Sequence, residues 1–320
     1  MKFTLQSVAQ FSEQDAYDLF RKTRWAETGG EPVCPRCGGL KSYRIGNRKV
    51  ARCAACRRDY TVTSGTYLNK HKLPLKTMAF MVAVFVNSAK GVPGLQMQRD
   101  TGLQYKSVFV LLHKFREAIQ AEQAPLKLSG VVEIDGAFFG GHFKRTNVVG
   151  FGRKTRLILN KRKHRRVVVV ARQRGGRTLT SVGRKESDAI PFILERVEPG
   201  ATIHVDMAHA WDSLAAIFET MRISHKHAYS FEGACTNWAE SFNARLRRIA
   251  NTHHKISGDY LAAYAAETAW REDHRHLDPR AKFIALLSLL LRPVPQSRWA
   301  GYWQRQPEHK DVDYGFPRAA

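Results

Sequence analysis

The sequence predicts an α/β domain, built on a mixed β-sheet with flanking helices and preceded by two smaller segments. Three observations support this prediction. In the second half of the chain, stretches with the alternation of strands are interleaved with stretches of helical periodicity. Two CxxC pairs lie nearer the N-terminus, and a long helical stretch follows them. A length of 320 residues and an apolar fraction of 43% suit a folded chain with one large core.

The spacing of apolar residues places the individual elements. Residues 11–26 form the first expected helix, with Ser12 as its N-cap. The apolar face of this helix is expected to contain Tyr17, Phe20 and Trp25. In the α/β domain we expect strands at 131–138, 165–172, 177–182 and 202–206. We expect helices there at 185–197, 209–220 and 237–250, and a last apolar helix at 283–291.

Changes in pattern also predict the boundaries between segments. Pro125 and Gly130 interrupt the helical pattern and mark the start of the α/β domain. The expected segments are an N-terminal helix at 1–30, a four-cysteine segment at 31–66, a helical segment at 67–124, the α/β domain at 125–276, and a C-terminal helix and tail at 277–320.

The charge of the chain indicates a polyanionic partner. There are 52 Lys and Arg against 28 Asp and Glu, a formal net charge of +24. Such a field attracts nucleic acid; a membrane surface is the alternative, but that would require the charge to lie on one amphipathic helix. The longest apolar run, Met78 to Val86, is shorter than the roughly 18 residues of a membrane span, and no signal peptide is recognisable. We therefore expect a cytoplasmic, DNA-binding protein without a membrane partner.

Four of the five cysteines predict a zinc site. Cys34 and Cys37 form one CxxC pair, Cys53 and Cys56 form another, and fifteen residues separate the pairs. Four thiolates at this spacing suit tetrahedral Zn²⁺ in a zinc ribbon, where the metal stabilises a segment too small to fold alone. The alternatives are unrelated reduced cysteines or a redox CxxC motif. Cys235 is interpreted as a small packing residue.

The helical segment at 75–120 has the layout of a helix-turn-helix. An apolar helix ends at 91–94, a short helix ends at Gly102, and a further helix starts near 104–107 with polar residues. In a helix-turn-helix, the second helix presents such residues to the major groove of DNA. A helical linker without DNA contacts has the same pattern and remains open as the alternative.

Three acidic residues are candidates for a second metal site. Asp135 and Asp206 each end an apolar strand, and Glu240 lies on a helix 34 positions after Asp206. Ligand sites of α/β sheets lie at the carboxyl ends of strands, where carboxylates can hold two Mg²⁺ ions for attack on a phosphodiester. Each residue also has a structural interpretation. The aspartates are common caps, and Asn237 with Glu240 fits a capping box.

Longer motifs resemble a known family. They include RWAETGGEPVCPRCGG, VEIDGAFFGG, HVDMAHAWDSL and TNWAESFNARLRR, in this order over residues 11–276. With these motifs the chain resembles bacterial insertion-sequence transposases that carry a zinc ribbon ahead of an ISXO-like DDE domain. The resemblance implies an RNase H-like fold, Mg²⁺ or Mn²⁺ as catalytic ions, and cleavage and strand transfer of double-stranded DNA. It also implies recognition of terminal inverted repeats, a target DNA and a homo-oligomer on DNA.

The same resemblance assigns roles to residues. Asp135, Asp206 and Glu240 fall on the DDE positions, and Asn237 is kept as a substitute or helper for the third acid. Arg247 stands where the family usually has Lys, and we expect it to position a phosphate or a terminal base. A basic stretch at 152–166 is a further departure, interpreted as a DNA-contacting loop or a solvated charge run. A transposase-derived DNA-binding protein and a nuclease that cuts without joining remain the alternatives.

Overall fold

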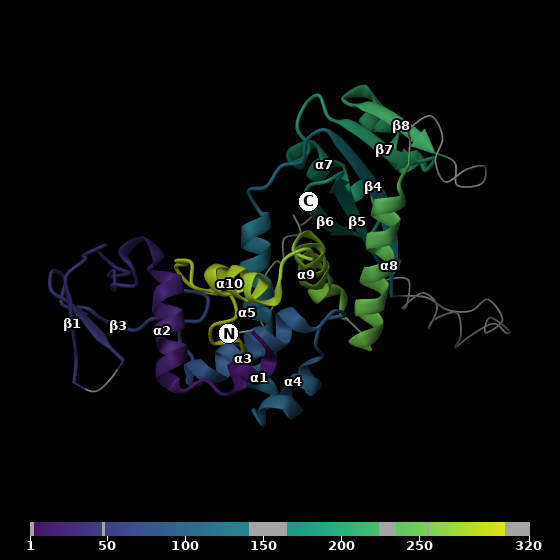
Figure 1. Ribbon diagram of the computed structural model, residues 1–320. Helices are drawn as coiled ribbons and strands as arrows, with labels where there is room; N and C mark the ends of the chain where they lie inside the picture. Colours follow the sequence, from purple (N-terminus) through teal and green to yellow (C-terminus); the bar gives the residue numbers. More distant parts are fainter. Residues whose placement is uncertain (1–2, 47–48, 141–164, 224–234, 255, 305–320) are drawn as a thin grey trace. The chain divides into compact units, whose positions relative to one another are not determined.

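A computed structural model describes residues 3–46, 49–140, 165–223, 235–254 and 256–304 (Figure 1). The chain divides into two compact units. The first unit contains the described residues up to Glu122 and those from His276 onward, and the second contains Gln123–Arg275. The C-terminal helix therefore belongs to the same unit as the N-terminal segments.

The first unit combines a small three-stranded antiparallel sheet, in the order β1-β2-β3, with a group of helices. Its elements are α1 (Leu5–Ala9), α2 (Glu13–Arg24), η1 (Ala26–Thr28), β1 (Ser42–Arg44), β2 (Ala51–Cys53), β3 (Asp59–Tyr60), α3 (Leu75–Asn87), α4 (Gly94–Thr101), α5 (Tyr105–Gln123), α10 (Pro279–Leu290) and η6 (Tyr302–Gln304), where η marks a short 3₁₀ helix.

The predicted N-terminal helix is confirmed as α2. Ser12 is its N-cap and accepts a hydrogen bond from the amide of Asp15. Its expected apolar face is buried, because Tyr17, Phe20 and Trp25 are each less than 10% exposed. The carboxylate of Glu13 accepts hydrogen bonds from the first amides of α3, so α2 also caps a second helix.

The helix-turn-helix pattern is also present. α3 is buried along most of its length and packs against α1, α2, α4 and α10. α4 ends at Gly102, whose φ of +67° is a left-handed conformation that glycine adopts without strain. α5 then begins with an exposed turn that contains Tyr105, Lys106 and Ser107. Polar side chains are thus presented at the N-terminus of the second helix of the motif.

The second unit contains the predicted α/β domain. Its elements are β4 (Val131–Phe139), β5 (Arg166–Gln173), β6 (Thr178–Gly183), η3 (Glu186–Ala189), α7 (Ile190–Arg196), β7 (Thr202–Asp206), η4 (His209–Ala216), β8 (Glu219–Ile223), α8 (Asn237–Thr252), η5 (Gly258–Tyr260) and α9 (Leu261–Asp273).

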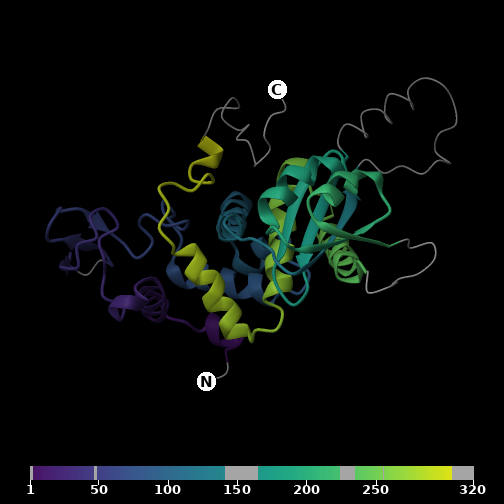
Figure 2. The same cartoon turned by 90° about the horizontal axis from the view of Figure 1, so that it is seen from above.

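The sheet of this unit has the order β6-β5-β4-β7-β8, and its strands lie side by side in Figure 2. β5 is antiparallel to β4 and β6, whereas β4, β7 and β8 are parallel. A meander of three strands followed by two parallel strands on the other side of the first is the topology of RNase H-like domains. The predicted mixed sheet is confirmed.

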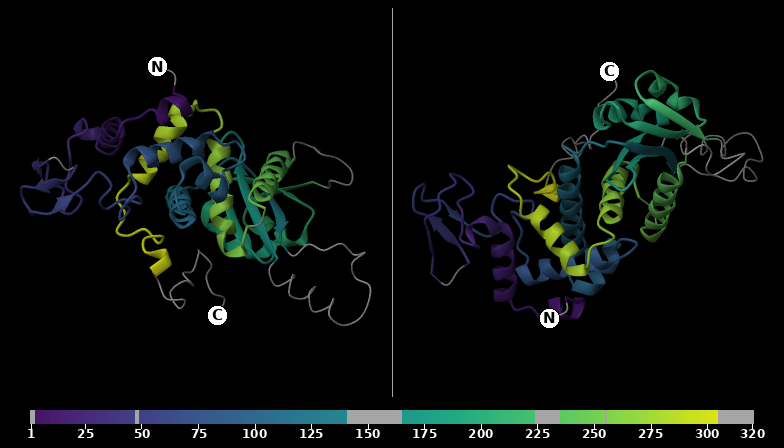
Figure 3. Two further views of the ribbon diagram at one scale, coloured as in Figure 1. Left: turned by 90° about the horizontal axis from the view of Figure 1, so that it is seen from below. Right: turned by 45° about the horizontal axis from the view of Figure 1, so that its top comes forward.

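Helices cover both faces of this sheet. On one face, Val132, Ile134 and Val205 pack with residues of α7 and η4, such as Ile193 and Trp211. On the other face, strand residues pack with α8 and α9, which lie on the same side of the sheet in the right panel of Figure 3. The alternation of the side chains of β4 therefore sends Glu133 and Asp135 toward α8.

One predicted helix is wrong. Residues 209–220 form the 3₁₀ helix η4 and the start of β8, a strand that the sequence analysis did not predict. The buried residues Trp211, Leu214 and Phe218 have the spacing of a helix face, which explains the prediction. Among the described residues, no helix combines the length and the apolarity needed to cross a bilayer.

Candidate active site

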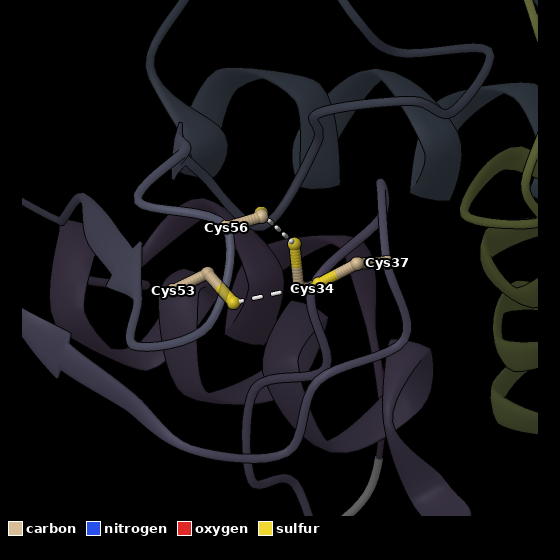
Figure 4. Close-up of side chains that lie close together, drawn as sticks. All are labelled: Cys34, Cys37, Cys53 and Cys56. Carbon is tan, nitrogen blue, oxygen red and sulfur yellow. Dashed lines mark hydrogen bonds between the residues drawn. The ribbon is translucent and has the colours of Figure 1, made fainter.

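Four cysteines of the first unit converge at one point (Figure 4). The sulfur atoms of Cys34 and Cys56 are 3.6 Å apart, as are those of Cys37 and Cys53. All four sulfurs lie within 4.8 Å of one another. Tetrahedral zinc, with bonds of about 2.3 Å, places its sulfur ligands about 3.8 Å apart. The cluster therefore has the donors and the spacing of a structural zinc site.

Backbone amides favour the thiolate form at two of these cysteines. Burial opposes the ionisation of Cys34, but the amides of Cys37 and Arg36 donate to its sulfur and its pKa is lowered to about 7. At Cys53, the amide of Cys56 lowers the thiol pKa against an opposing effect of burial. At Cys37 the effect of a backbone amide is outweighed by the neighbouring sulfurs of Cys56 and Cys53, which raise the thiol pKa to about 11. Because the thiolate is the form that binds metal, the backbone prepares Cys34 and Cys53 as donors.

Asp135 lies in the middle of a strand. The expectation that it ends an apolar strand is wrong, because 136–139 remain paired with β5 and β4 continues to Phe139. One carboxylate oxygen of Asp135 accepts a hydrogen bond of 2.8 Å from the side-chain amide of Asn243 on α8. The other accepts one of 2.8 Å from the backbone amide of Gly136. Both oxygens of Asp135 are therefore oriented by neighbours.

Asp206 is the last residue of β7, as the sequence predicted. Its Oδ1 accepts hydrogen bonds of 3.0 Å from the backbone amide of Ala208 and from the indole Nε1 of Trp211. Trp211 is buried in the core of the unit. The core thus fixes one oxygen of Asp206, and within the described ranges the other oxygen has no hydrogen-bond donor.

The register of the sheet places the two aspartates next to each other. The parallel ladder between β4 and β7 ends at the pair of Glu133 and His204. The same register, continued by two residues, puts Asp135 beside Asp206. The two carboxylates therefore lie where the neighbouring strands separate, at the carboxyl end of β7.

The electrostatics of this region favour a cation. Burial raises the pKa of Asp135, and the negative charges of Asp206 and Glu240 raise it further, whereas the hydrogen bond from Asn243 lowers it. The three acids do not form a closed cluster, because within the described ranges only the four cysteines bring three or more ligand atoms within 4.8 Å of one another. The acids are close enough to repel one another, and carboxylate oxygens are the donors that Mg²⁺ and Mn²⁺ prefer.

The start of α8 differs from the predicted capping box. α8 begins at Asn237, its N-cap is Thr236, and Glu240 stands one position beyond the third helical residue. Asn237 with Glu240 is therefore not a capping box. The hydroxyl of Thr236 donates to Glu240 Oε1 at 3.4 Å, and the Glu240 side chain is half-buried. The side chain of Glu240 therefore contacts the N-cap residue Thr236 and does not form the predicted box with Asn237.

A buried carboxylate from β4 caps α8 instead. Glu133 is fully buried, and its Oε2 accepts hydrogen bonds from the backbone amides of Trp238 at 2.8 Å and Ala239 at 3.2 Å. Its Oε1 pairs with the guanidinium of Arg174 at 2.9 Å. The positive end of a helix dipole favours a negative charge at this place. The central strand of the sheet thereby fixes the helix that carries Glu240.

Arg174 extends this contact into a partly buried polar network. Its Nη2 lies 3.1 Å from Nδ1 of His204 and 2.7 Å from the sulfur of Cys235. Burial lowers the pKa of His204, and the nearby Arg174 lowers it further. Cys235 thus lies in the network that holds α8.

The other predicted residues of α8 lie at its surface. Asn237 and Arg247 are both exposed. Arg247 follows Glu240 by seven residues and therefore lies on the same face of the helix. The basic stretch 152–166 lies outside the described residues except for Arg165 and Arg166. The Arg165 guanidinium lies 3.8 Å from the centre of the exposed Phe138 ring.

Sequence analysis missed two residues of this region. Asn243, which binds Asp135, is only 1% exposed, and its position three residues after Glu240 on one helix was the available signal. Glu186, at the start of η3, lies against Gly136: a Cβ on Gly136 would be 2.6 Å from Glu186 Oε1. A glycine inside an apolar strand indicates such a close approach, so this signal was present in the sequence as well.

The fold and the two sites define the class of the protein: an RNase H-like α/β domain joined to a four-cysteine zinc ribbon. Comparison with protein families agrees. Residues 127–273 match the ISXO2-like transposase domain, and residues 11–59 match the transposase zinc-ribbon domain. Together these two matches cover well over half of the chain, which therefore belongs to the transposases that combine a zinc ribbon with an ISXO2-like domain. No curated protein sequence matches it.

Proposed function

We propose that this transposase cleaves and joins DNA strands at the ends of an insertion sequence, with Asp135, Asp206 and Glu240 as the ligands of its catalytic divalent ions. The observation that carries the proposal is the placement of Asp135 and Asp206. They come from adjacent parallel strands, at matching register positions where these strands separate. α8, which carries Glu240, is anchored to the same central strand by Glu133.

The residues of the site would divide the work as follows. When bound, Mg²⁺ or Mn²⁺ activates a water or a 3′-hydroxyl and stabilises the leaving oxygen. Asn243 and the amide of Gly136 orient the two oxygens of Asp135, and Trp211 holds one oxygen of Asp206, so both carboxylates keep a fixed direction toward a bound ion. Arg247, on the same helix face as Glu240, would position a phosphate of the DNA. Asn237, exposed at the first turn of α8, would assist as a helper of the third acid.

The first unit would recognise the DNA. The exposed N-terminal turn of α5 presents Tyr105, Lys106 and Ser107, as a recognition helix does in the major groove. The zinc ribbon would add contacts to the same terminal inverted repeat. The net charge of +24 supports binding of both the repeat and a target DNA. A homo-oligomer that holds two ends together remains a prediction.

An assay of products tests this proposal. Zinc-loaded protein is incubated with Mg²⁺ and a plasmid that carries the DNA flanking the gene on both sides. We expect cuts at defined ends and joining of those ends to a second DNA. Cuts without joined products would indicate a nuclease, and specific binding without cuts would indicate a DNA-binding protein derived from a transposase.

The third acid needs its own comparison. Glu240→Gln removes a charged ligand but keeps the size of the side chain, whereas Asn237→Ser changes an exposed residue at the start of the helix. We expect Glu240→Gln to abolish cleavage at normal thermal stability and Asn237→Ser to keep most of the activity. The reverse order would assign the third position to Asn237.

A further inference from the structure

A fourth carboxylate, that of Glu186, lies against Gly136, the neighbour of Asp135 in the central strand. Gly136 pairs with Val169, whose side chain belongs to the core under α7 and η4. The missing side chain of Gly136 therefore points to that face, away from α8. Glu186 occupies this space, since a Cβ on Gly136 would lie 2.6 Å from its Oε1 and 2.8 Å from its Cγ. Only glycine leaves room for Glu186 at this position.

Local structure directs Glu186 toward the site. The residue follows β6 and begins η3, and the carboxylate of Asp188 accepts hydrogen bonds from the amides of Arg184 and Lys185. This turn holds the backbone on either side of Glu186. The ladder between β4 and β7 ends at Glu133, so Gly136 lies beyond the paired residues of these two strands.

The charges around Glu186 are those of the acidic site. Burial raises the pKa of Glu186, and Asp206 and Asp135 raise it further, while Arg165 lowers it. Within the described part of the chain, no hydrogen bond or ion pair neutralises its carboxylate. Three carboxylates that repel one another are less unfavourable when a divalent cation binds near them, and Arg165 supplies only a single positive charge.

A second observation points to a ligand at the same place. Asn243 is 1% exposed, and its Nδ2 donates to Asp135 at 2.8 Å. Its Oδ1 is buried and has no hydrogen-bond partner among the residues that the structure describes. A buried amide oxygen without a donor is costly, and it suits a hard cation or a water molecule on that cation.

We propose that Glu186 is a fourth carboxylate ligand of the divalent ions, an inference that rests on the proposed function. The side chain of Glu186 would approach the ions held by Asp135 and Asp206 through the space that Gly136 leaves open. The ions would then be held from the α8 face by Glu240 and from the opposite face by Glu186. An additional negative ligand strengthens the binding of a hard divalent cation, because its charge offsets the loss of hydration.

Mn²⁺ binding to the full-length, zinc-loaded protein tests this inference without any measurement of activity. Binding is followed by titration calorimetry and by the electron paramagnetic resonance signal of free Mn²⁺. Glu186→Gln should raise the Kd for Mn²⁺ by about tenfold or more. Glu195→Gln is the matched control, since Glu195 lies on the adjacent α7 with its side chain 69% exposed, and it should leave the Kd unchanged.

Thermal unfolding separates a ligand from a structural residue. Without Mn²⁺, Glu186→Gln should keep or raise the Tm, because a charge that repels two neighbours is removed. If Glu186 only stabilised the fold, its replacement by Gln would lower the Tm. Gly136→Ala should weaken Mn²⁺ binding by displacing Glu186, and it should have no further effect in a Glu186→Ala background, since the two changes act on one contact.

The outcomes distinguish this inference from the proposed function. In one outcome, Asp135→Asn and Asp206→Asn lose Mn²⁺ binding, but Glu186→Gln binds Mn²⁺ with the same Kd as the control Glu195→Gln. Glu186 is then not a ligand, and the proposed function stands. If Asp135→Asn and Asp206→Asn bind Mn²⁺ as wild type does, or if wild type binds none, both proposals are overturned.

Discussion

Glu133→Ala should destabilise the second unit by about 3–4 kcal/mol, because Glu133 links the sheet to α8. Its carboxylate is fully buried and accepts from two backbone amides and one guanidinium, at 2.8, 3.2 and 2.9 Å. Removing it leaves the amide of the buried Ala239 without an acceptor, at a cost of about 1–3 kcal/mol. Arg174 also loses its partner, but its side chain is 32% exposed and regains water. The sum lies at the lower end of the roughly 3–5 kcal/mol for breaking a buried ion pair.

Thermal unfolding and hydrogen exchange measure this effect. A loss of about 3–4 kcal/mol corresponds to a Tm lowered by roughly 10 °C for a domain of this size. Amides of 237–252 should exchange faster, because the start of α8 is no longer held. Glu133→Gln keeps an acceptor oxygen and should lose about half as much, whereas the exposed Glu195→Ala should stay within about 0.5 kcal/mol of wild type. If Glu133→Ala unfolds at the same temperature as Glu195→Ala, and hydrogen exchange in α8 is unchanged, Glu133 does not anchor the helix.

Three further results are expected. Purified protein should hold about one Zn²⁺ per chain, and Cys53→Ser should lose the zinc and unfold residues 31–66. The control variant Cys235→Ser should keep both the zinc and the fold. Retention of zinc by Cys53→Ser would contradict the assignment of a zinc ribbon. Burial raises the pKa of Asp273 to about 6, above its unfolded value, so ionisation of this carboxyl lowers the stability of the fold as pH rises from about 4 to 6. Asp273→Asn should therefore increase the free energy of unfolding by up to about 3 kcal/mol above pH 6 and leave it unchanged near pH 4. A difference between variant and wild type that is the same at both pH values in urea unfolding would refute this. DNA affinity should fall steeply with salt. Alanine at Arg162, Lys163, Arg165 and Arg166 should flatten this slope by up to about four units and leave the repeat preference largely intact. An unchanged slope would mean that this stretch is only a solvated surface.

The sequence predicts most strongly what depends on local spacing. The two CxxC pairs bring four sulfurs together because each pair is one tight turn, and the apolar strands bring Asp135 and Asp206 to neighbouring positions. The spacing of apolar residues also predicts the α/β class. Strands and helices differ in the number of residues between side chains on one face, and this number depends only on the backbone conformation. β8 was missed because its preceding residues have a helical spacing of apolar side chains.

Contacts between distant segments could not be predicted in this way. Glu133 caps α8 from more than a hundred positions away, so the first turn of the helix carries no sign of its cap. The local pattern at Asn237 favoured a capping box, yet the carboxylate from β4 already satisfies the helix end. Glu186 reaches Gly136 across fifty residues, and only the glycine itself hinted at that approach.

The central claim is that Asp135 and Asp206 hold the ions for DNA cleavage. The most direct measurement is the single-turnover cleavage rate of terminal DNA against Mg²⁺ concentration for wild type, Asp135→Asn and Asp206→Asn. Asparagine keeps the size of each side chain and removes the charge that binds the ion. We expect a rate lowered by about 10³-fold or more in both variants, at wild-type DNA affinity and thermal stability. A rate within tenfold of wild type in either variant, with the fold intact, would contradict it.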